Sequence, residues 1–198
     1  MKCVIQKNCF FLKSVFNELD FPNEHLSEVG FWGRSNVGKS SLLNCLTKSK
    51  IAKTSKTPGR TKSLNFFEIP SKLRLVDFPG YGFARVSKKE SRNWNRLISN
   101  YLSKRRNIFC IFLLIDARHG LKEVDFDAIN FLESFGNHFF IVLTKIDKVK
   151  SLDLEICLSK TEKILKNKVA ADEKIFLTST KQKKGILELK KKIINIMG

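Results

Sequence analysis

The stretch that decides the fold is Gly33-Arg34-Ser35-Asn36-Val37-Gly38-Lys39-Ser40, which matches the pattern G-x-x-x-x-G-K-[ST] at every position. An apolar run at 28–32 precedes it, and a helical pattern at 40–46 follows it. A glycine-rich turn between a strand and a helix lets backbone N–H groups surround a phosphate. In this pattern Lys39 reaches the β- and γ-phosphates and Ser40 coordinates Mg²⁺. We therefore predict a nucleotide-phosphate loop, the P-loop, at residues 33–40.

The rest of the chain alternates short apolar runs with helical segments, which predicts an α/β fold with a mainly parallel sheet. The expected strands are 28–32, 63–69, 73–76, 108–115, 139–143 and 175–177. The expected helices are 10–19, 40–46, 90–105, 123–135, 152–168 and 186–197. Two polar loops containing Pro-Gly, at 49–61 and 77–89, separate these elements, and we expect the first to be mobile.

The base of the nucleotide is selected by Thr144-Lys145-Ile146-Asp147, which follows the predicted strand 139–143. In open α/β sheets, ligands bind outside the carboxyl ends of the strands. A carboxylate there can accept hydrogen bonds from the ring N–H and the exocyclic amine of guanine, a donor pair that adenine lacks on that edge. The stem of Lys145 can lie over the purine face. Alone this tetrapeptide is equally consistent with a solvated turn, but together with the P-loop it favours guanine.

Asp77-Phe78-Pro79-Gly80 follows the predicted strand 73–76. An acid at this position can hold Mg²⁺ through water, and the Gly80 N–H can sense the γ-phosphate. A plain Pro-Gly turn is the alternative interpretation. After the last strand, the backbone of Thr178-Ser179-Thr180 can contact the guanine oxygen, although only its position indicates this.

A threonine hydroxyl in the first polar loop can close on Mg²⁺ when a γ-phosphate is present, and this would order the loop. Thr61 is a candidate, and Thr54 and Thr57 compete with it. The three histidines are isolated and form no site, and Asp125 and Asp127 are interpreted as lying on a helix surface.

The formal net charge of +18 indicates an anionic partner, although an AT-rich genome would also enrich the chain in lysine. The basic residues around the two polar loops are Lys48, Lys50, Lys53, Lys56, Arg60 and Lys62, then Arg85, Lys88, Lys89, Arg92 and Arg96. Nucleotide state can thus present or withdraw a phosphate-binding surface, the alternative being solvated lysines. A third cluster, Lys181, Lys183, Lys184 and 190–192, is more typical of a soluble helix face.

Five scattered cysteines with no C-x-x-C pair argue against disulfides or a zinc site and favour a reducing cytosol. The longest clean apolar run, 108–115, is too short to span a membrane. Cys110 within it is expected to be a core residue.

These motifs, in this order, resemble those of the EngB family (also called YihA or YsxC), bacterial GTPases of ribosome assembly related to the TrmE, Era, EngA and septin-like P-loop GTPases. The matching stretches are 33–42, Thr54-Ser55-Lys56-Thr57-Pro58-Gly59-Arg60-Thr61, Asn65-Phe66-Phe67, Leu75-Val76-Asp77-Phe78-Pro79-Gly80-Tyr81-Gly82 and Asp116-Ala117-Arg118-His119-Gly120. Phe11-Leu12-Lys13-Ser14 is also similar to the family. The resemblance covers nearly the whole chain.

The resemblance implies a three-layer fold with a six-stranded, mostly parallel sheet, one antiparallel strand and helices on both faces. It divides the chain into an extension, 1–22, that packs on a GTP-binding domain, 23–198. The implied ligands are GTP or GDP and Mg²⁺, and the implied partner is the large ribosomal subunit or its precursor, through rRNA. We expect a cytoplasmic monomer that binds neither DNA nor a membrane.

By the same resemblance, Ser40 and Thr61 are the metal ligands, with Asp77 acting through water. The first switch is Gly59, Arg60, Thr61, Lys62 and Ser63, and the groups closest to the reaction are Lys39, Thr61 and Gly80. Two positions depart from the family pattern: Trp32 replaces a small residue, and Thr178 starts a motif that is usually Phe-Ser-Ser.

Tyr81 stands where many GTPases place a glutamine that orients the attacking water. We therefore expect slow intrinsic hydrolysis, accelerated by a partner or by a monovalent cation, with the Asn36 amide oxygen as a candidate K⁺ ligand. Two other classes stay open, a binding module with negligible hydrolysis and a membrane or cell-division-site GTPase; septation and cell-cycle roles belong to the latter. Liposome binding discriminates the membrane class.

Overall fold

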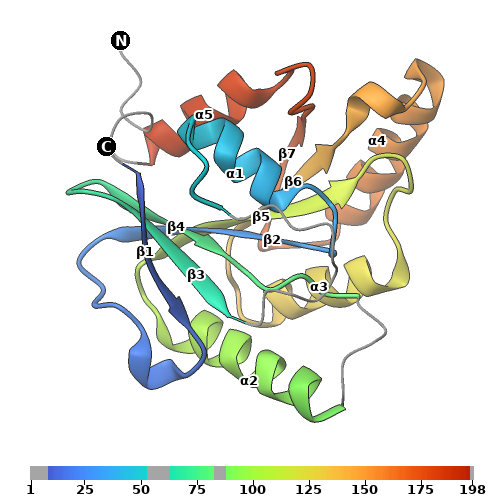
Figure 1. Cartoon of the computed structure of the whole chain (residues 1–198). Helices are drawn as coiled ribbons and strands as arrows, with labels where there is room; N and C mark the ends of the chain where they lie inside the picture. The colour runs from blue at the N-terminus through green and yellow to red at the C-terminus, as the bar shows by residue number, and fades with distance from the viewer. Residues whose placement is uncertain (1–8, 53–62, 83–87, 197–198) are drawn as a thin grey trace.

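The computed structural model describes residues 9–52, 63–82 and 88–196, with side chains from residue 92 onward in the last range. It contains a seven-stranded sheet in the order β1-β3-β4-β2-β5-β6-β7 (Figure 1). The strands are β1 (Phe10–Val15), β2 (Ser27–Gly33), β3 (Leu64–Ile69), β4 (Leu73–Asp77), β5 (Ile108–Asp116), β6 (Phe139–Thr144) and β7 (Ala171–Leu177). Only β3 runs against its neighbours, β1 and β4, so the predicted single antiparallel strand is confirmed.

The expected helix at 10–19 is wrong, and this adds the seventh strand to the six that were expected. Residues Phe10–Val15 form β1, and a short 3-10 turn, η2, follows at Glu18–Asp20. The outer edge of β3 offers unpaired backbone groups, and β1 pairs with them. Phe11 packs edge-on against Phe67, and the Ser14 hydroxyl donates to Asn65 Oδ1 at 2.6 Å. These cross-strand contacts override the helical spacing of the sequence.

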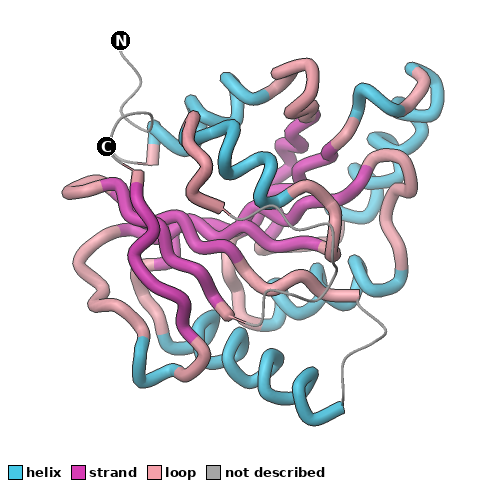
Figure 2. Tube along the Cα trace, in the orientation of Figure 1, coloured by secondary structure: helices cyan, strands magenta, loops and turns pink. Residues whose placement is uncertain are grey.

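The described helices are α1 (Lys39–Thr47), α2 (Lys88–Lys104), α3 (Glu123–Ser134), α4 (Ser151–Leu165) and α5 (Ile186–Asn195). Buried side chains of α1 and α5 pack on one face of the sheet, and those of α2, α3 and α4 pack on the other. Figure 2 shows the sheet between these two helical layers. Because both faces are covered, β5 and β6 are buried along most of their length and read as continuous apolar runs. Cys110 lies in this core, as expected.

Lys190 corrects the interpretation of the last basic cluster as a soluble helix face. Its side chain is buried, and its Nζ donates to the Leu46 carbonyl at the end of α1 at 3.0 Å. A cation is favourable beside the carbonyl end of a helix, so this lysine joins α5 to α1. Lys191 is exposed, and the Lys192 Nζ lies 4.6 Å from the centre of the Phe140 ring. Within the described ranges, no helix combines the length and apolarity needed to cross a bilayer.

The amino ends of the parallel strands carry a fully buried carboxylate, Glu28. Arg105 donates to it from Nε at 2.9 Å and Nη2 at 2.5 Å, and the Tyr101 hydroxyl donates at 2.8 Å. Arg74 lies 3.6 Å away and also donates to the Asn23 carbonyl. Because Arg105 reaches the Pro22 carbonyl as well, this cluster ties the segment before β2 to the start of the sheet.

We expect Arg105→Met to destabilise the protein by about 3–5 kcal/mol, because it leaves the buried Glu28 carboxylate without its main partner. Lys104→Met is the matched control, since the neighbouring Lys104 makes only an exposed ion pair with Glu18 and its loss costs less than about 1 kcal/mol. Urea unfolding followed by circular dichroism measures both. Equal losses in the two variants would contradict a dominant role for the Glu28 cluster.

Candidate nucleotide site

The P-loop begins where β2 ends, because Gly33 has no side chain. A Cβ at Gly33 would lie 2.7 Å from the Leu114 carbonyl oxygen of β5, which is closer than any side chain allows. Gly38 adopts a φ of 113°, in the left-handed region, immediately before α1. The two glycines therefore let residues 33–38 turn tightly and place the N-terminus of α1 at the carboxyl edge of the sheet.

The last residue of β6 and the residue that follows it hold the P-loop in place. The Thr144 hydroxyl donates to the Val37 carbonyl at 2.8 Å, and the Lys145 Nζ donates to the Asn36 carbonyl at 2.6 Å. Lys145 also pairs with Asp116 Oδ2, at 2.7 Å. Although burial opposes it, hydrogen bonds from Arg118 and Lys145 hold the pKa of Asp116 well below its usual value. The ammonium of Lys145 thus joins the ends of β5 and β6 to the P-loop.

Asp147 lies in the short 3-10 turn η3 (Ile146–Lys148) that follows β6. The Ser179 hydroxyl donates to Asp147 Oδ1 at 2.6 Å, and this bond lowers the pKa of Asp147. The structure therefore brings the predicted base-binding segments, 144–147 and 178–180, together. Beside them is a hollow of about 60 Å³, which is lined by the P-loop, α1 and the ends of β6 and β7.

Asp77 ends β4 and faces the first residue of α1. Its side chain is buried, and the Lys39 Nζ lies 3.5 Å from Asp77 Oδ1, an oxygen that accepts no close hydrogen bond. Burial raises the pKa of Asp77, and the charge of Lys39 opposes this effect. A buried carboxylate oxygen with such a loose partner is unusual, because buried polar atoms are nearly always satisfied. It can therefore take a further ligand.

The donor set at this point fits Mg²⁺. Within the described ranges, no three His, Cys, Asp or Glu residues gather into a metal site made by the protein alone. The oxygens of Ser40 and Asp77 are hard donors, and Mg²⁺ is usually held by one or two such groups together with phosphate oxygens and water. The metal would therefore be shared with a bound nucleotide.

The segment after Asp77 rests on the P-loop. Phe78 is fully buried against Trp32, and the Trp32 Nε1 donates to the Pro79 carbonyl at 3.1 Å. A Cβ on Gly80 would lie 3.0 Å from the backbone nitrogen of Ser35. The core thus accommodates Trp32, which departs from the family pattern.

Other predicted site residues are dispersed or undescribed. Gly59, Arg60, Thr61 and Lys62 lie outside the described residues, as do Thr54 and Thr57. Ser63 is buried, and its hydroxyl donates to Asn65 Oδ1 at 3.0 Å.

Two acids contribute more to the site than the sequence indicated. Asp116 holds Lys145, and the signal for it was its position directly after an apolar strand, like Asp77. Asp125 was interpreted as a surface residue, but its side chain is fully buried beside Arg34. Only Asp127 of that pair is exposed.

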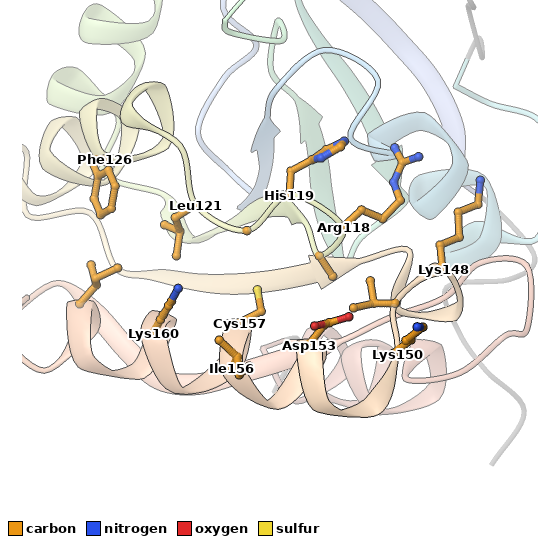
Figure 3. A pocket seen from close by; sticks show the side chains of 14 residues that line it. Arg118, His119, Leu121, Phe126, Lys148, Lys150, Asp153, Ile156, Cys157 and Lys160 are labelled. Atoms are coloured by element: carbon orange, nitrogen blue, oxygen red, sulfur yellow. The ribbon is translucent and has the colours of Figure 1, made fainter.

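A separate cavity of about 610 Å³ lies between α4 and the loop that leads from β5 to α3 (Figure 3). Leu121, Ile156 and Cys157 give it apolar walls, while Lys148 and Lys150 stand at one end.

Comparisons with known proteins agree with this geometry. A family model described as 50S ribosome-binding GTPase matches residues 28–145. A probable GTP-binding protein EngB of Aquifex aeolicus is 46% identical over 186 residues, covering 93% of this chain and 98% of that protein. The chain belongs to the EngB family of GTP-binding proteins. Like the GTPase domain that the family model describes, it is a GTPase.

Other EngB proteins and their relatives extend the comparison. The probable GTP-binding protein EngB of Caulobacter vibrioides is 44% identical, covering 88% of this chain and 77% of that protein. The crystal structure of a probable GTP-binding protein EngB superposes with a TM-score of 0.70 at 23% identity, covering 86% of this chain and 98% of that chain. This likeness bears out the predicted P-loop GTPase fold.

We expect Ser179→Ala to weaken GDP binding by about tenfold, because Asp147 loses the hydrogen bond that orients its carboxylate. Titration of a fluorescent GDP derivative measures the change. Ser134→Ala is the control, since the Ser134 hydroxyl also donates a hydrogen bond, to the Phe131 carbonyl, but lies in α3, whereas the Ser179 hydroxyl in addition accepts the Gln182 N–H. An unchanged affinity in Ser179→Ala would show that Asp147 needs no such support.

Proposed function

We propose that the protein is a cytoplasmic GTP-driven switch whose GTP-bound form docks on the large ribosomal subunit or its precursor. The observation that carries the proposal is the assembly of the P-loop, Asp77 and Asp147 at one edge of the sheet in a chain of net charge +18. In the same proposal, residues 23–198 form the GTP-binding domain and 1–22 an extension on it, supported by the pairing of β1 with β3.

Each part of the edge has a distinct task in this proposal. The P-loop backbone and the N-terminus of α1 surround the phosphates, and Lys39 leaves Asp77 to contact the β- and γ-phosphates. Asp147 accepts the two guanine donors, the stem of Lys145 lies against the purine, and the backbone of 178–180 contacts the guanine oxygen. The side chain of Arg34 is engaged with α3, so its backbone serves the P-loop.

Hydrolysis requires positioning and charge neutralisation more than covalent chemistry. Bound Mg²⁺ would be held by Ser40 and Thr61, with Asp77 acting through water, and it would neutralise charge that develops on the phosphates. Lys39 stabilises the same charge, and the Gly80 N–H donates to the γ-phosphate. No glutamine follows Gly80, so we infer that intrinsic hydrolysis is slow.

A monovalent cation is one proposed accelerator. Asn36 is exposed, with a positive φ of 62°, and its backbone carbonyl is already held by Lys145. Its side-chain amide oxygen remains at the phosphate edge as a candidate K⁺ ligand.

Replacing Na⁺ with K⁺ at constant ionic strength should raise the rate of phosphate release in the wild-type protein about tenfold or more, because the cation adds positive charge at the phosphates. Asn36→Ala should abolish the difference between the two salts. The measurement is single-turnover GTP hydrolysis, and equal rates in the two salts would eliminate K⁺ as an activator.

The proposed docking surface is basic. Of the lysines and arginines around the two polar loops, Lys48, Lys50, Arg92 and Arg96 have described side chains, and all four are exposed. A crystal structure of the related GTPase Era, 25% identical with a TM-score of 0.67, contains MgGDPNP and nucleotides 1506–1542 of 16S ribosomal RNA; the match covers 87% of this chain and 57% of that chain. Together with the ribosome-binding description of the family model, this supports an rRNA partner.

The test is co-sedimentation with large ribosomal subunits and their precursors across a salt series. We expect retention with a non-hydrolysable GTP analogue at moderate salt and release with GDP. Arg92→Glu with Arg96→Glu should weaken retention and make the remaining binding less dependent on salt, because each substitution removes a phosphate contact. Lys181→Glu with Lys183→Glu is a charge-matched control. Binding that does not depend on the nucleotide and is lost as salt increases would show that the +18 charge attracts the subunits nonspecifically. Binding to anionic liposomes instead of ribosomal subunits would indicate a membrane GTPase.

A further inference from the structure

The side chain of Tyr81, at the position of the water-orienting glutamine of other GTPases, is not free to orient a water molecule. Its hydroxyl donates to Asp125 Oδ1 at 2.8 Å, and its ring packs edge-on against Trp32 with centroids 5.2 Å apart. Asp125 lies in the first turn of α3. The phenol at the position after Gly80 is therefore already committed to another element.

Asp125 is a fully buried carboxylate with three partners. Besides Tyr81, it pairs with the Arg34 Nε at 3.2 Å and accepts the Lys122 backbone N–H at 2.8 Å. Burying a carboxylate is costly unless such donors surround it, and charge-assisted hydrogen bonds are stronger than neutral ones. Removal of one partner leaves a penalty that the other two do not offset. Asp125 therefore acts as a junction and not as a surface acid.

The backbone of Tyr81 is joined to the P-loop as well. The Ser35 N–H donates to the Tyr81 carbonyl at 3.2 Å, and Arg34 and Tyr81 form an isolated parallel bridge. Gly80 lies so close to Ser35 that a Cβ added to Gly80 would be 3.0 Å from the Ser35 nitrogen and would press the two segments apart. Any displacement of Tyr81 must consequently move Gly80 relative to the P-loop.

Arg34 extends the junction in the other direction. Its Nη2 donates to the Gly120 carbonyl at 3.2 Å, and Gly120 lies in the wall of the cavity shown in Figure 3. Arg34 thus connects the second residue of the P-loop with both the β5–α3 loop and the start of α3.

We propose that Asp125 is a positioning residue that holds Tyr81 and Arg34 together, so that the Gly80 N–H is fixed where a γ-phosphate enters. This inference rests on the proposed nucleotide site. Because GDP has no γ-phosphate, the junction of Arg34, Tyr81 and Asp125 sets the preference for GTP over GDP and leaves the binding of GDP itself unaffected. It also explains why Tyr81 is not a substitute for a water-orienting glutamine.

The chain contains its own control for this idea. Tyr101 is the other tyrosine, and its hydroxyl donates to Glu28 at 2.8 Å. Glu28 is likewise a fully buried carboxylate paired with an arginine, but at the opposite edge of the sheet. Tyr81→Phe and Tyr101→Phe therefore remove the same kind of bond, one beside the P-loop and one remote from it.

The experiment compares dissociation constants for GDP and for a non-hydrolysable GTP analogue, with Mg²⁺, in the full-length wild-type protein and both variants. Tyr81→Phe should weaken binding of the analogue about tenfold and leave GDP binding unchanged, as expected for a hydrogen bond to a charged group. Tyr101→Phe should change neither dissociation constant, although it should lower the thermal unfolding midpoint about as much as Tyr81→Phe does. A change in the analogue-to-GDP ratio shared by both variants would overturn the proposal, since it would reflect general destabilisation.

Asp125→Asn provides a second measurement, because Asn retains the shape of the side chain and loses its charge. If Tyr81 and Asp125 act as one unit, combining Tyr81→Phe with Asp125→Asn should shift the analogue-to-GDP ratio no further than the more affected single variant does. Additive effects of the two substitutions would overturn the junction. If the wild-type protein binds neither nucleotide, the proposed nucleotide site itself is refuted. If the wild-type protein binds both and Tyr81→Phe leaves the ratio of the two dissociation constants unchanged, the site stands and the junction is refuted.

Discussion

The close approach of β2 to β5 at Gly33 is the constraint on which the site depends. With a Cβ 2.7 Å from the Leu114 carbonyl, the end of β2 could not lie where it does, and the turn that follows would shift. The bonds that hold this turn come from two other segments. At the end of β6, Thr144 donates to the Val37 carbonyl and Lys145 to the Asn36 carbonyl; after β4, the Tyr81 carbonyl accepts the Ser35 N–H. These bonds hold the P-loop where the turn at Gly33 places it, so the backbone requirement at one glycine supports the contacts along the carboxyl ends of the strands.

Buried charge is paired differently at the amino ends and at the carboxyl ends of the parallel strands. At the amino edge, Glu28 is saturated by two arginines and a tyrosine, which suits a permanent structural role. At the carboxyl edge, Asp77 keeps an oxygen whose nearest donor, Lys39, is 3.5 Å away. A loose pair costs little to separate, so Lys39 could turn to a phosphate, and Asp77 would then be available to hold Mg²⁺ through water, as proposed. The difference in hydrogen bonding thus distinguishes the exchangeable edge from the fixed one.

Local sequence patterns predicted the parts of the fold that depend on local physics. The P-loop glycines, the buried strands and the acid after β6 each carry their signal within a few residues, and their positions agree with the structure. The parts that failed depend on distant partners. Phe10–Val15 has helical spacing but becomes a strand because β3 presents an open edge, and Asp125 and Lys190 are polar residues whose buried partners lie on other elements. The role of Thr61 remains a prediction, since it lies outside the described residues.

The use of acids connects the site to the charge of the whole chain. Among the described residues four acids are buried, Glu28, Asp77, Asp116 and Asp125, and each pairs with a lysine or an arginine. Three of them hold the basic groups of the nucleotide edge in place. Acids are scarce in this chain, 19 against 37 lysines and arginines, and each buried acid is already matched by a base. The buried pairs therefore leave the net charge of +18 to the other residues, and a basic excess of this kind attracts a polyanion such as RNA.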